Sequence, residues 1–206
     1  MRISPLNQIQ RIESAVKLAE KKFTHQDRVR VLPSGWRAFS TAAPRSAAYQ
    51  ATPTFLLLSK LDAMKLPREY HLADLGSGLG LACFTASLYF ERVTGFELDP
   101  ALLRAAENVR AELGIKNVAF KNQDFLEADL SPFNALYIFQ PFLDGFIQLF
   151  SQKLLELKPG TIVLANLFDV AQPRIFNPAA FKLIHGRREG AASPLALDCI
   201  YAFQRR

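Results

Sequence analysis

The fold of this chain is decided by the stretch Asp74-Leu75-Gly76-Ser77-Gly78-Leu79-Gly80. This stretch follows a short apolar segment and precedes a segment with helical periodicity. A glycine-rich loop between a strand and a helix lets the backbone turn sharply and approach a ligand closely, because glycine has no Cβ. The dinucleotide-binding fingerprint needs its third glycine one position later, where this chain has Leu81. The spacing therefore disfavours an NAD-dependent oxidoreductase.

Strand-like and helix-like segments alternate on both sides of this loop. Short apolar strands are predicted at residues 71–75, 92–97, 117–121, 134–139 and 161–166. Helices are predicted between them at about residues 80–90, 100–113 and 143–157. Two last strands, at 181–186 and 197–204, are expected to pair as an antiparallel hairpin at the sheet edge, with a loop at 190–194. The alternation favours right-handed crossovers, so we predict an α/β three-layer sandwich around a mostly parallel sheet.

The basic residues gather in the first quarter of the chain. Residues 1–50 contain nine Lys/Arg and three Asp/Glu, so they carry the whole net charge of +6. An amphipathic helix is predicted over residues 5–24 and a second helix over 54–65, with residues 25–53 between them irregular. We divide the chain into a basic N-terminal helical arm, 1–50, and a domain, 51–206. The arm is either a solvated helix face or a contact for an acidic partner or nucleic acid.

Several classes of protein are excluded by composition. The two cysteines, Cys83 and Cys199, lie far apart, which excludes a disulfide scaffold and a cysteine-based zinc site. The three histidines share no ligand spacing, so no metal site is predicted. No apolar run approaches the roughly 18 residues that span a bilayer, and the start has no secretory character. We expect a cytoplasmic protein.

Acidic side chains follow three of the predicted strands. Asp74, two residues before the first glycine, suits a cationic or amine-bearing ligand rather than a pyrophosphate. Glu97 ends the second strand, 21 residues after Gly76, where a carboxylate accepts from two ribose hydroxyls. Asp124 follows the third strand and suits an adenine amino group, with Phe125 beside the ring. Together these positions describe an adenosine ligand with an amino-acid tail.

At these residues the sequence resembles the class I, seven-strand S-adenosylmethionine-dependent methyltransferases. Leu157-Lys158-Pro159-Gly160-Thr161, before the fifth strand, adds to the likeness. The resemblance implies a Rossmann-like sheet whose last strand is antiparallel, and S-adenosylmethionine as the cofactor. It also implies a set of cofactor-binding residues. They are Asp74, Gly76, Ser77, Gly78, Gly80, Glu97, Leu98, Asp124, Phe125 and Gln140, with Tyr49 and Thr52 lying over the cofactor.

Within that class the chain is similar to small protein-lysine methyltransferases of the ATP synthase c-subunit type. The shared stretches are Tyr49-Gln50-Ala51-Thr52-Pro53, Gly95-Phe96-Glu97-Leu98-Asp99-Pro100 and Leu154-Leu155-Glu156-Leu157-Lys158-Pro159-Gly160. The chain departs from that group at Leu79-Gly80-Leu81-Ala82, where the group usually has an acid and an arginine. The likeness implies a protein lysine as the methyl acceptor.

The acceptor is expected at the end of the fourth strand, in Tyr137-Ile138-Phe139-Gln140-Pro141-Phe142. This stretch partly resembles the Asn/Asp-Pro-Pro-Tyr/Phe motif of amino-group methyltransferases. Gln140 is predicted to accept a hydrogen bond from the acceptor nitrogen, and Phe142 to wall the methyl group. No catalytic acid or base is predicted. Two alternatives stay open: N-methylation of RNA or DNA bases, and a module that binds S-adenosylmethionine without turnover.

Overall fold

The computed structural model describes residues 5–24, 29–31, 37–39, 54–139, 144–166, 175–186 and 200–206. The helices are α1 (Pro5–Thr24), α2 (Thr54–Met64), α3 (Leu81–Ala86), α4 (Pro100–Leu113) and α5 (Asp144–Leu155). The strands are β1 (Val29–Val31), β2 (Arg37–Phe39), β3 (His71–Leu75), β4 (Arg92–Glu97), β5 (Val118–Asn122), β6 (Ala135–Phe139), β7 (Ile162–Asn166), β8 (Phe181–His185) and β9 (Ile200–Arg205).

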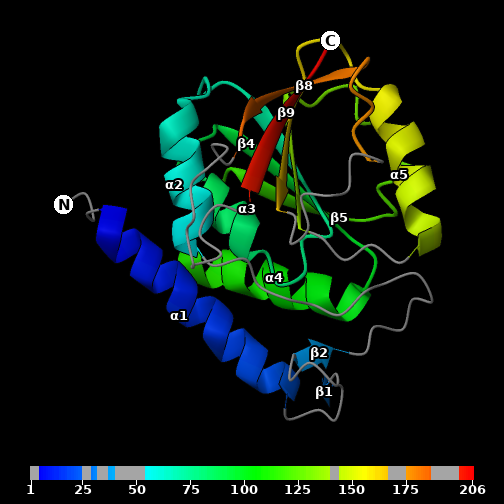
Figure 1. Ribbon diagram of the computed structural model, residues 1–206. Helices are drawn as coiled ribbons and strands as arrows, with labels where there is room; N and C mark the ends of the chain where they lie inside the picture. Colours follow the sequence, from blue (N-terminus) through cyan, green and yellow to red (C-terminus); the bar gives the residue numbers. More distant parts are fainter. Residues whose placement is uncertain are drawn as a thin grey trace.

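A seven-stranded sheet with the order β5-β4-β3-β6-β7-β9-β8 forms the centre of the fold (Figure 1). Strands β3 to β7 pair in parallel. Strand β9 runs antiparallel to both of its neighbours, β7 and β8. The mostly parallel sheet with an antiparallel last strand is therefore confirmed, and so is the terminal hairpin. Because the order reverses between β3 and β6, the carboxyl ends of these strands open a crevice where ligands bind in such folds.

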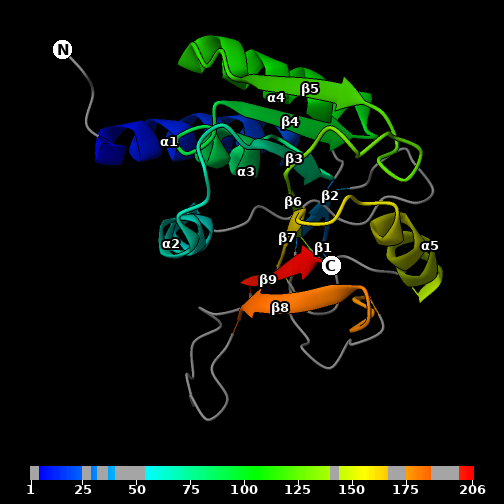
Figure 2. The ribbon, with the colours of Figure 1, turned by 90° about the horizontal axis from the view of Figure 1, so that it is seen from above.

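Helices cover the two faces of the sheet unequally. Helices α1 to α4 lie on one side and α5 on the other, as Figure 2 shows from above. Two separate apolar clusters fill the two interfaces. Along β7, Ile162 and Leu164 belong to the first cluster, whereas Val163 and Ala165 belong to the second. Both faces of the strand are buried, which is why the parallel strands read as continuous apolar runs.

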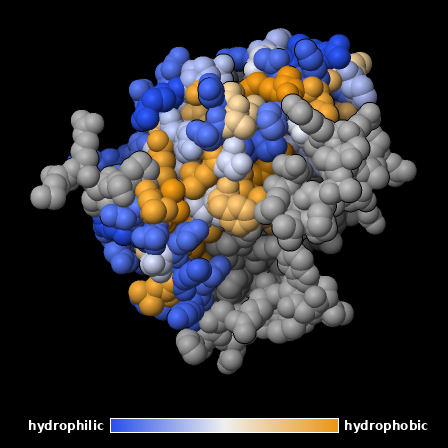
Figure 3. All heavy atoms as spheres, turned by 60° about the vertical axis from the view of Figure 1, so that its left-hand side comes forward, coloured by the Kyte–Doolittle hydropathy of each residue, from blue (hydrophilic) through white to orange (hydrophobic). Residues whose placement is uncertain are grey.

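Helix α1 lies across α3 and α4 as an outer layer. Its Ile12 and Val16 are only 3% and 1% exposed and belong to the first apolar cluster. Hydrophilic and hydrophobic residues are interspersed on the surface that Figure 3 shows. The exposed apolar residues of α1 and α2 include Leu6, Leu18 and Phe55. The division of the chain at residues 50 and 51 stays a prediction.

Two sequence predictions need correction. Residues 25–53 are not irregular throughout, because β1 and β2 pair as a short antiparallel ladder. Strands of three residues are too short to show periodicity in the sequence. Helix α3 ends at Ala86 rather than near residue 90. The Ser87 hydroxyl donates to the carbonyl of Phe84 at 2.7 Å, and tight turns then bring Phe90 into the core.

Two classes of feature are missing from the described part of the chain. Its helices include none that is both long and apolar enough to cross a membrane. Its His, Cys, Asp and Glu side chains form no group of three that could hold a metal ion.

Candidate functional site

The glycine loop after β3 needs glycine at three positions. Gly76, Gly78 and Gly80 have φ angles of +85°, +53° and +83°, which L side chains rarely adopt. A Cβ on Gly80 would stand 2.7 Å from the ring of Phe120, so that position also has no room for a side chain. A Cβ on Gly76 would meet no atom within 4 Å, so the loop has open space on that side. Glycine at these three positions therefore permits both the sharp turn and the space for a ligand.

Glu97 at the end of β4 holds the loop. Its side chain is 7% exposed, with Oε2 accepting from the backbone N–H of Gly78 and Oε1 from that of Asp99, both at 2.8 Å. Burial raises the pKa of Glu97, while the backbone hydrogen bonds oppose the rise. A carboxylate has about four acceptor sites, so about two remain for a ligand. This is the capacity that two vicinal hydroxyls require.

Asp74 lies one strand away from Glu97 and is 2% exposed. Its Oδ2 accepts from the Cys83 thiol at 3.1 Å. Burial raises the pKa of Asp74 to about 7; the thiol hydrogen bond lowers it and the charge of Glu97 raises it further. Burial also raises the pKa of Cys83 well above its ordinary value, so this thiol is no nucleophile. Asp74 is a buried carboxyl without a cationic partner among the described residues, as expected of a site for a cationic ligand.

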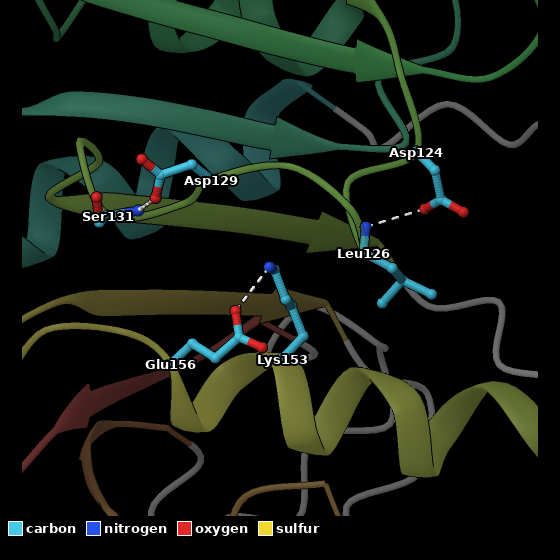
Figure 4. Close-up of polar contacts among 6 residues, drawn as sticks. All are labelled: Asp124, Leu126, Asp129, Ser131, Lys153 and Glu156. Atoms are coloured by element: carbon cyan, nitrogen blue, oxygen red, sulfur yellow. Dashed lines mark hydrogen bonds and ion pairs between the residues drawn. The ribbon is translucent and has the colours of Figure 1, made fainter.

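Asp124 and Phe125 follow β5 on the other side of Glu97. The Asp124 carboxylate accepts from the backbone N–H of Leu126 at 2.9 Å, as Figure 4 shows. Phe125 is half-buried, with its ring centroid 6.0 Å from that of Phe150 on α5. Because Asn122 donates to the carbonyl of Glu97 at 2.9 Å, the ends of β4 and β5 are joined beside this loop. Glu97 and the 124–125 turn therefore stand at neighbouring strand ends.

The remaining predicted residues divide into two groups. Leu98 and Ser77 are described: Leu98 is partly exposed beside Glu97, and Ser77 is buried in the loop. The others, Tyr49, Thr52, Gln140 and Phe142, lie outside the described residues.

Sequence reasoning missed two positions. A Cβ on Gly95 would stand 2.7 Å from Ser77 Oγ, so this strand glycine makes room for the loop. Asn166 is 1% exposed at the carboxyl end of β7, and its Oδ1 makes no hydrogen bond to any described residue. The signal for Asn166 was present in the sequence, because it is a polar residue closing the apolar run Ile162-Val163-Leu164-Ala165.

Comparison with known proteins agrees with this geometry. The model of the ANTKMT methyltransferase domain family matches residues 74–175. An RNA methyltransferase from Salinibacter ruber, solved with S-adenosyl-L-homocysteine, is similar at 26% identity and a TM-score of 0.60, over 76% of this chain and 94% of that one. A ribosomal protein L11 methylase from Lactobacillus delbrueckii subsp. bulgaricus shares the fold at 20% identity and a TM-score of 0.58, over 77% and 81%. A search of curated protein sequences finds no match.

The sheet order, the glycine loop and these matches define the class. The chain is a class I, seven-strand S-adenosylmethionine-dependent methyltransferase. Its cofactor is S-adenosylmethionine, and the residues at the strand ends fit that molecule. The open space beside Gly76 fits a close contact between the backbone and this molecule. The remaining acceptor sites of Glu97 fit its hydroxyls, and the buried carboxyl of Asp74 fits its positive charge.

Proposed function

We propose that this methyltransferase N-methylates a lysine side chain of a protein. The observation that carries the proposal is the match of residues 74–175 to the ANTKMT methyltransferase domain. The likeness of residues 49–53, which lie outside that match, to c-subunit-type lysine methyltransferases also supports it, as does the likeness of residues 95–100 within it.

The sheet edge beside the glycine loop offers the chemistry that a lysine acceptor needs. An ordinary lysine has a pKa of about 10.4, so presenting it neutral at pH 7 costs about 4–5 kcal/mol. Strands β6 and β7 contain no charged residue. On one face of β6, Tyr137 is buried and Phe139, two residues further along the strand, is half-buried. An apolar wall of this kind desolvates an ammonium group and lowers its pKa. The neutral amine is then available as a nucleophile.

The bound cofactor supplies a methyl group activated on a sulfonium sulfur. The residues of the chain bind and orient the reactants, because an in-line displacement depends mainly on position and on exclusion of water. With the cofactor bound, the transfer would balance as a displacement: the amine lone pair would form the new N–C bond, the C–S bond would give its electrons to sulfur, and one N–H proton would pass to solvent. No side-chain base is required by this balance.

Each predicted site residue has a role in the proposal. Glu97 binds the ribose hydroxyls, and Asp124 with Phe125 binds the adenine. The glycine loop, with Ser77 and Leu98, lines the methionine and ribose part beside Asp74. Tyr49 and Thr52 cover the cofactor, and Gln140 and Phe142 contact the acceptor. The partner is a protein substrate, and the compartment is the cytoplasm.

A second candidate is N-methylation of nucleic-acid bases. The similar Salinibacter ruber protein is an RNA methyltransferase, and residues 1–50 of this chain carry its net positive charge. This function predicts nucleic-acid binding that weakens steeply with salt.

Label transfer separates the candidates. The protein is incubated with methyl-labelled S-adenosylmethionine and a lysate, and the product is split between protease and nuclease. Label removed by protease alone, and found on lysine by mass spectrometry, is the expected result. Label removed by nuclease alone overturns the lysine assignment. The variant Gly78→Val, with its strained loop, is the matched control for transfer that does not depend on this site.

A further inference from the structure

Buried polar atoms without hydrogen bonds mark places where a ligand can complete the bonding of a fold. Among the described residues, four buried side-chain atoms make no hydrogen bond: Thr54 Oγ1, Ser77 Oγ, Asn166 Oδ1 and Arg205 Nε. Asn166 is 1% exposed, so neither solvent nor the described part of the chain satisfies its oxygen. An apolar residue would fit such a position better unless the oxygen has a binding role.

Strand register places Asn166 on the glycine-loop side of the sheet. It pairs with Phe139 of β6 and Ile200 of β9. Side chains alternate along a strand, and Ile162, Leu164 and Ile200 all belong to the cluster under α2 and α3. Asn166 therefore faces the same side, and Phe139 packs against the same cluster.

The same register relates Asn166 to the proposed cofactor site. Leu75 pairs with Phe96 on one side and with Ile138 on the other. One residue further along, Glu97, Gly76, Phe139 and Asn166 therefore form one row across the carboxyl edge of the sheet. Strands lie about 4.8 Å apart, so Asn166 is about 14 Å from Glu97 in this row. If Glu97 holds the ribose, Asn166 lies beyond the methionine end, where a methyl acceptor enters.

Thr54 gives a second unpartnered oxygen toward the same edge. It is the first residue of α2 and is 3% exposed. Six residues, 65–70, join the end of α2 to the start of β3. An 11-residue helix and a five-residue strand both span about 16 Å, so α2 begins near the carboxyl edge (Figure 1). Two buried oxygens without partners thus approach the crevice from opposite layers.

We propose that Asn166 binds the methyl acceptor, with its Oδ1 accepting an N–H of the acceptor amine. This inference rests on the proposed function and assigns a residue to its acceptor side. A neutral amide oxygen orients the amine and directs its lone pair away from the N–H bond. Unlike a carboxylate, it does not strongly stabilise the ammonium form, which is not nucleophilic. The acceptor it selects has an N–H to donate.

The test pairs Asn166→Leu with Asn117→Leu as a matched control. Asn117 donates to the carbonyls of Ser87 and Phe90, both at 2.9 Å, so its amide has a structural role. For Asn166→Leu we expect an unchanged or higher Tm, S-adenosylhomocysteine binding within twofold of the wild type, and label transfer from methyl-labelled S-adenosylmethionine to the lysate reduced about tenfold or more. For Asn117→Leu we expect a lower Tm and unchanged transfer per folded molecule.

Other outcomes refute the inference. Transfer by Asn166→Leu within threefold of the wild type shows that the amide does not bind the acceptor. A fall in Tm like that of Asn117→Leu assigns Asn166 a structural role instead. If only the lysine assignment is wrong, the result is distinguishable. The label then appears in nucleic acid, and the Asn166 variants still reduce the amount of label transferred. A wild type that binds S-adenosylhomocysteine but labels nothing in the lysate refutes both proposals.

Asn166→Asp supplies a second readout. A carboxylate beside the amine stabilises its ammonium form, so the pH profile of transfer is expected to move to higher pH. Other titratable groups also face this side of the sheet. Among the described residues they include Asp74, Cys83, Glu97 and Tyr137, together with Lys60 of α2 and His185 of β8, whose Nζ and Nδ1 are 2.9 Å apart. These groups, including Asp74 with its pKa of about 7, are common to both proteins, so the difference between the two pH profiles reports the introduced carboxylate. Coincident profiles contradict contact between Asn166 and the amine.

Discussion

Replacing Asp74 by Asn tests the electrostatic part of the site most directly. The side chain is 2% exposed, and burial raises its pKa from 3.8 to about 7. A tenfold change in an acid dissociation constant corresponds to about 1.4 kcal/mol, so ionising Asp74 costs the folded state about 4 kcal/mol relative to the unfolded state. Asn has the same shape, and its oxygen can still accept from the Cys83 thiol. The variant removes the charge and keeps the contact.

The direction of the pH effect follows from proton binding. Between pH 3.8 and about 7 the folded protein keeps the Asp74 proton that the unfolded chain has lost. The contribution of Asp74 to stability is therefore fully present below pH 3.8 and is lost as the pH rises through about 7. In urea unfolding, the free energy of unfolding of Asp74→Asn minus that of the wild type is expected to increase between pH 4 and pH 8, by up to about 4 kcal/mol. Parallel stability profiles of the two proteins refute the reasoning.

Ligand binding is expected to show the opposite dependence on pH. S-adenosylmethionine carries a positive sulfonium and an ammonium group, so it favours ionised Asp74. Calorimetry should therefore find wild-type affinity rising by up to about tenfold per pH unit toward pH 7 and levelling above it. Asp74→Asn should bind more weakly above pH 7, with no such rise. A wild-type affinity that is constant from pH 5 to 8 contradicts a cationic ligand at Asp74.

Three further substitutions test the site and the fold. Glu97→Ala is expected to weaken S-adenosylmethionine binding more than tenfold, because it removes the carboxylate that accepts from the ribose hydroxyls. Each hydrogen bond to a charged group contributes about 1.5–3 kcal/mol. An unchanged Kd by calorimetry rules out the ribose contact. Gly78→Val should fold, as judged by circular dichroism, but lose cofactor binding, since valine is strained at a φ of +53°; wild-type affinity is the contrary result. Ile12→Ala should lower the free energy of unfolding by about 2–5 kcal/mol in urea, because Ile12 is 3% exposed in the core; a loss below about 0.5 kcal/mol means that α1 does not contribute to the cooperative fold.

The sequence predicts the sheet well because burial on both faces leaves a plain signal. Strands β3 and β4 and helix α4 have the predicted bounds, and the other sheet strands shift by one to three residues. Strand β5 begins at Val118 rather than at 117, although the Asn117 carbonyl still accepts from the backbone N–H of Val93 at 2.9 Å. The short β1 and β2 give too few residues for a pattern.

The candidate site is predictable only in part. Glu97 and Asp124 are found by their positions after strands, since the carboxyl ends of parallel strands share one edge. The role of Glu97 in holding Gly78 requires coordinates, because it joins residues 19 positions apart. Asp74 is conspicuous in the sequence, yet its raised pKa follows from burial. The sequence shows Asn166 only as a polar residue that closes an apolar run, and the structure is needed to show that its buried amide oxygen makes no hydrogen bond to a described residue.

The position of α1 has a consequence for synthesis of the chain. Its apolar residues are covered by α3 and α4, and residues 25–99 separate α1 from the start of α4. At about 5–20 residues per second, a ribosome needs roughly 4–15 s to make that interval. During this time Ile12 and Val16 lack their contacts with α4. Helix α1 is therefore made long before the helix that completes its packing, and its apolar stripe must wait for residues from the middle of the chain.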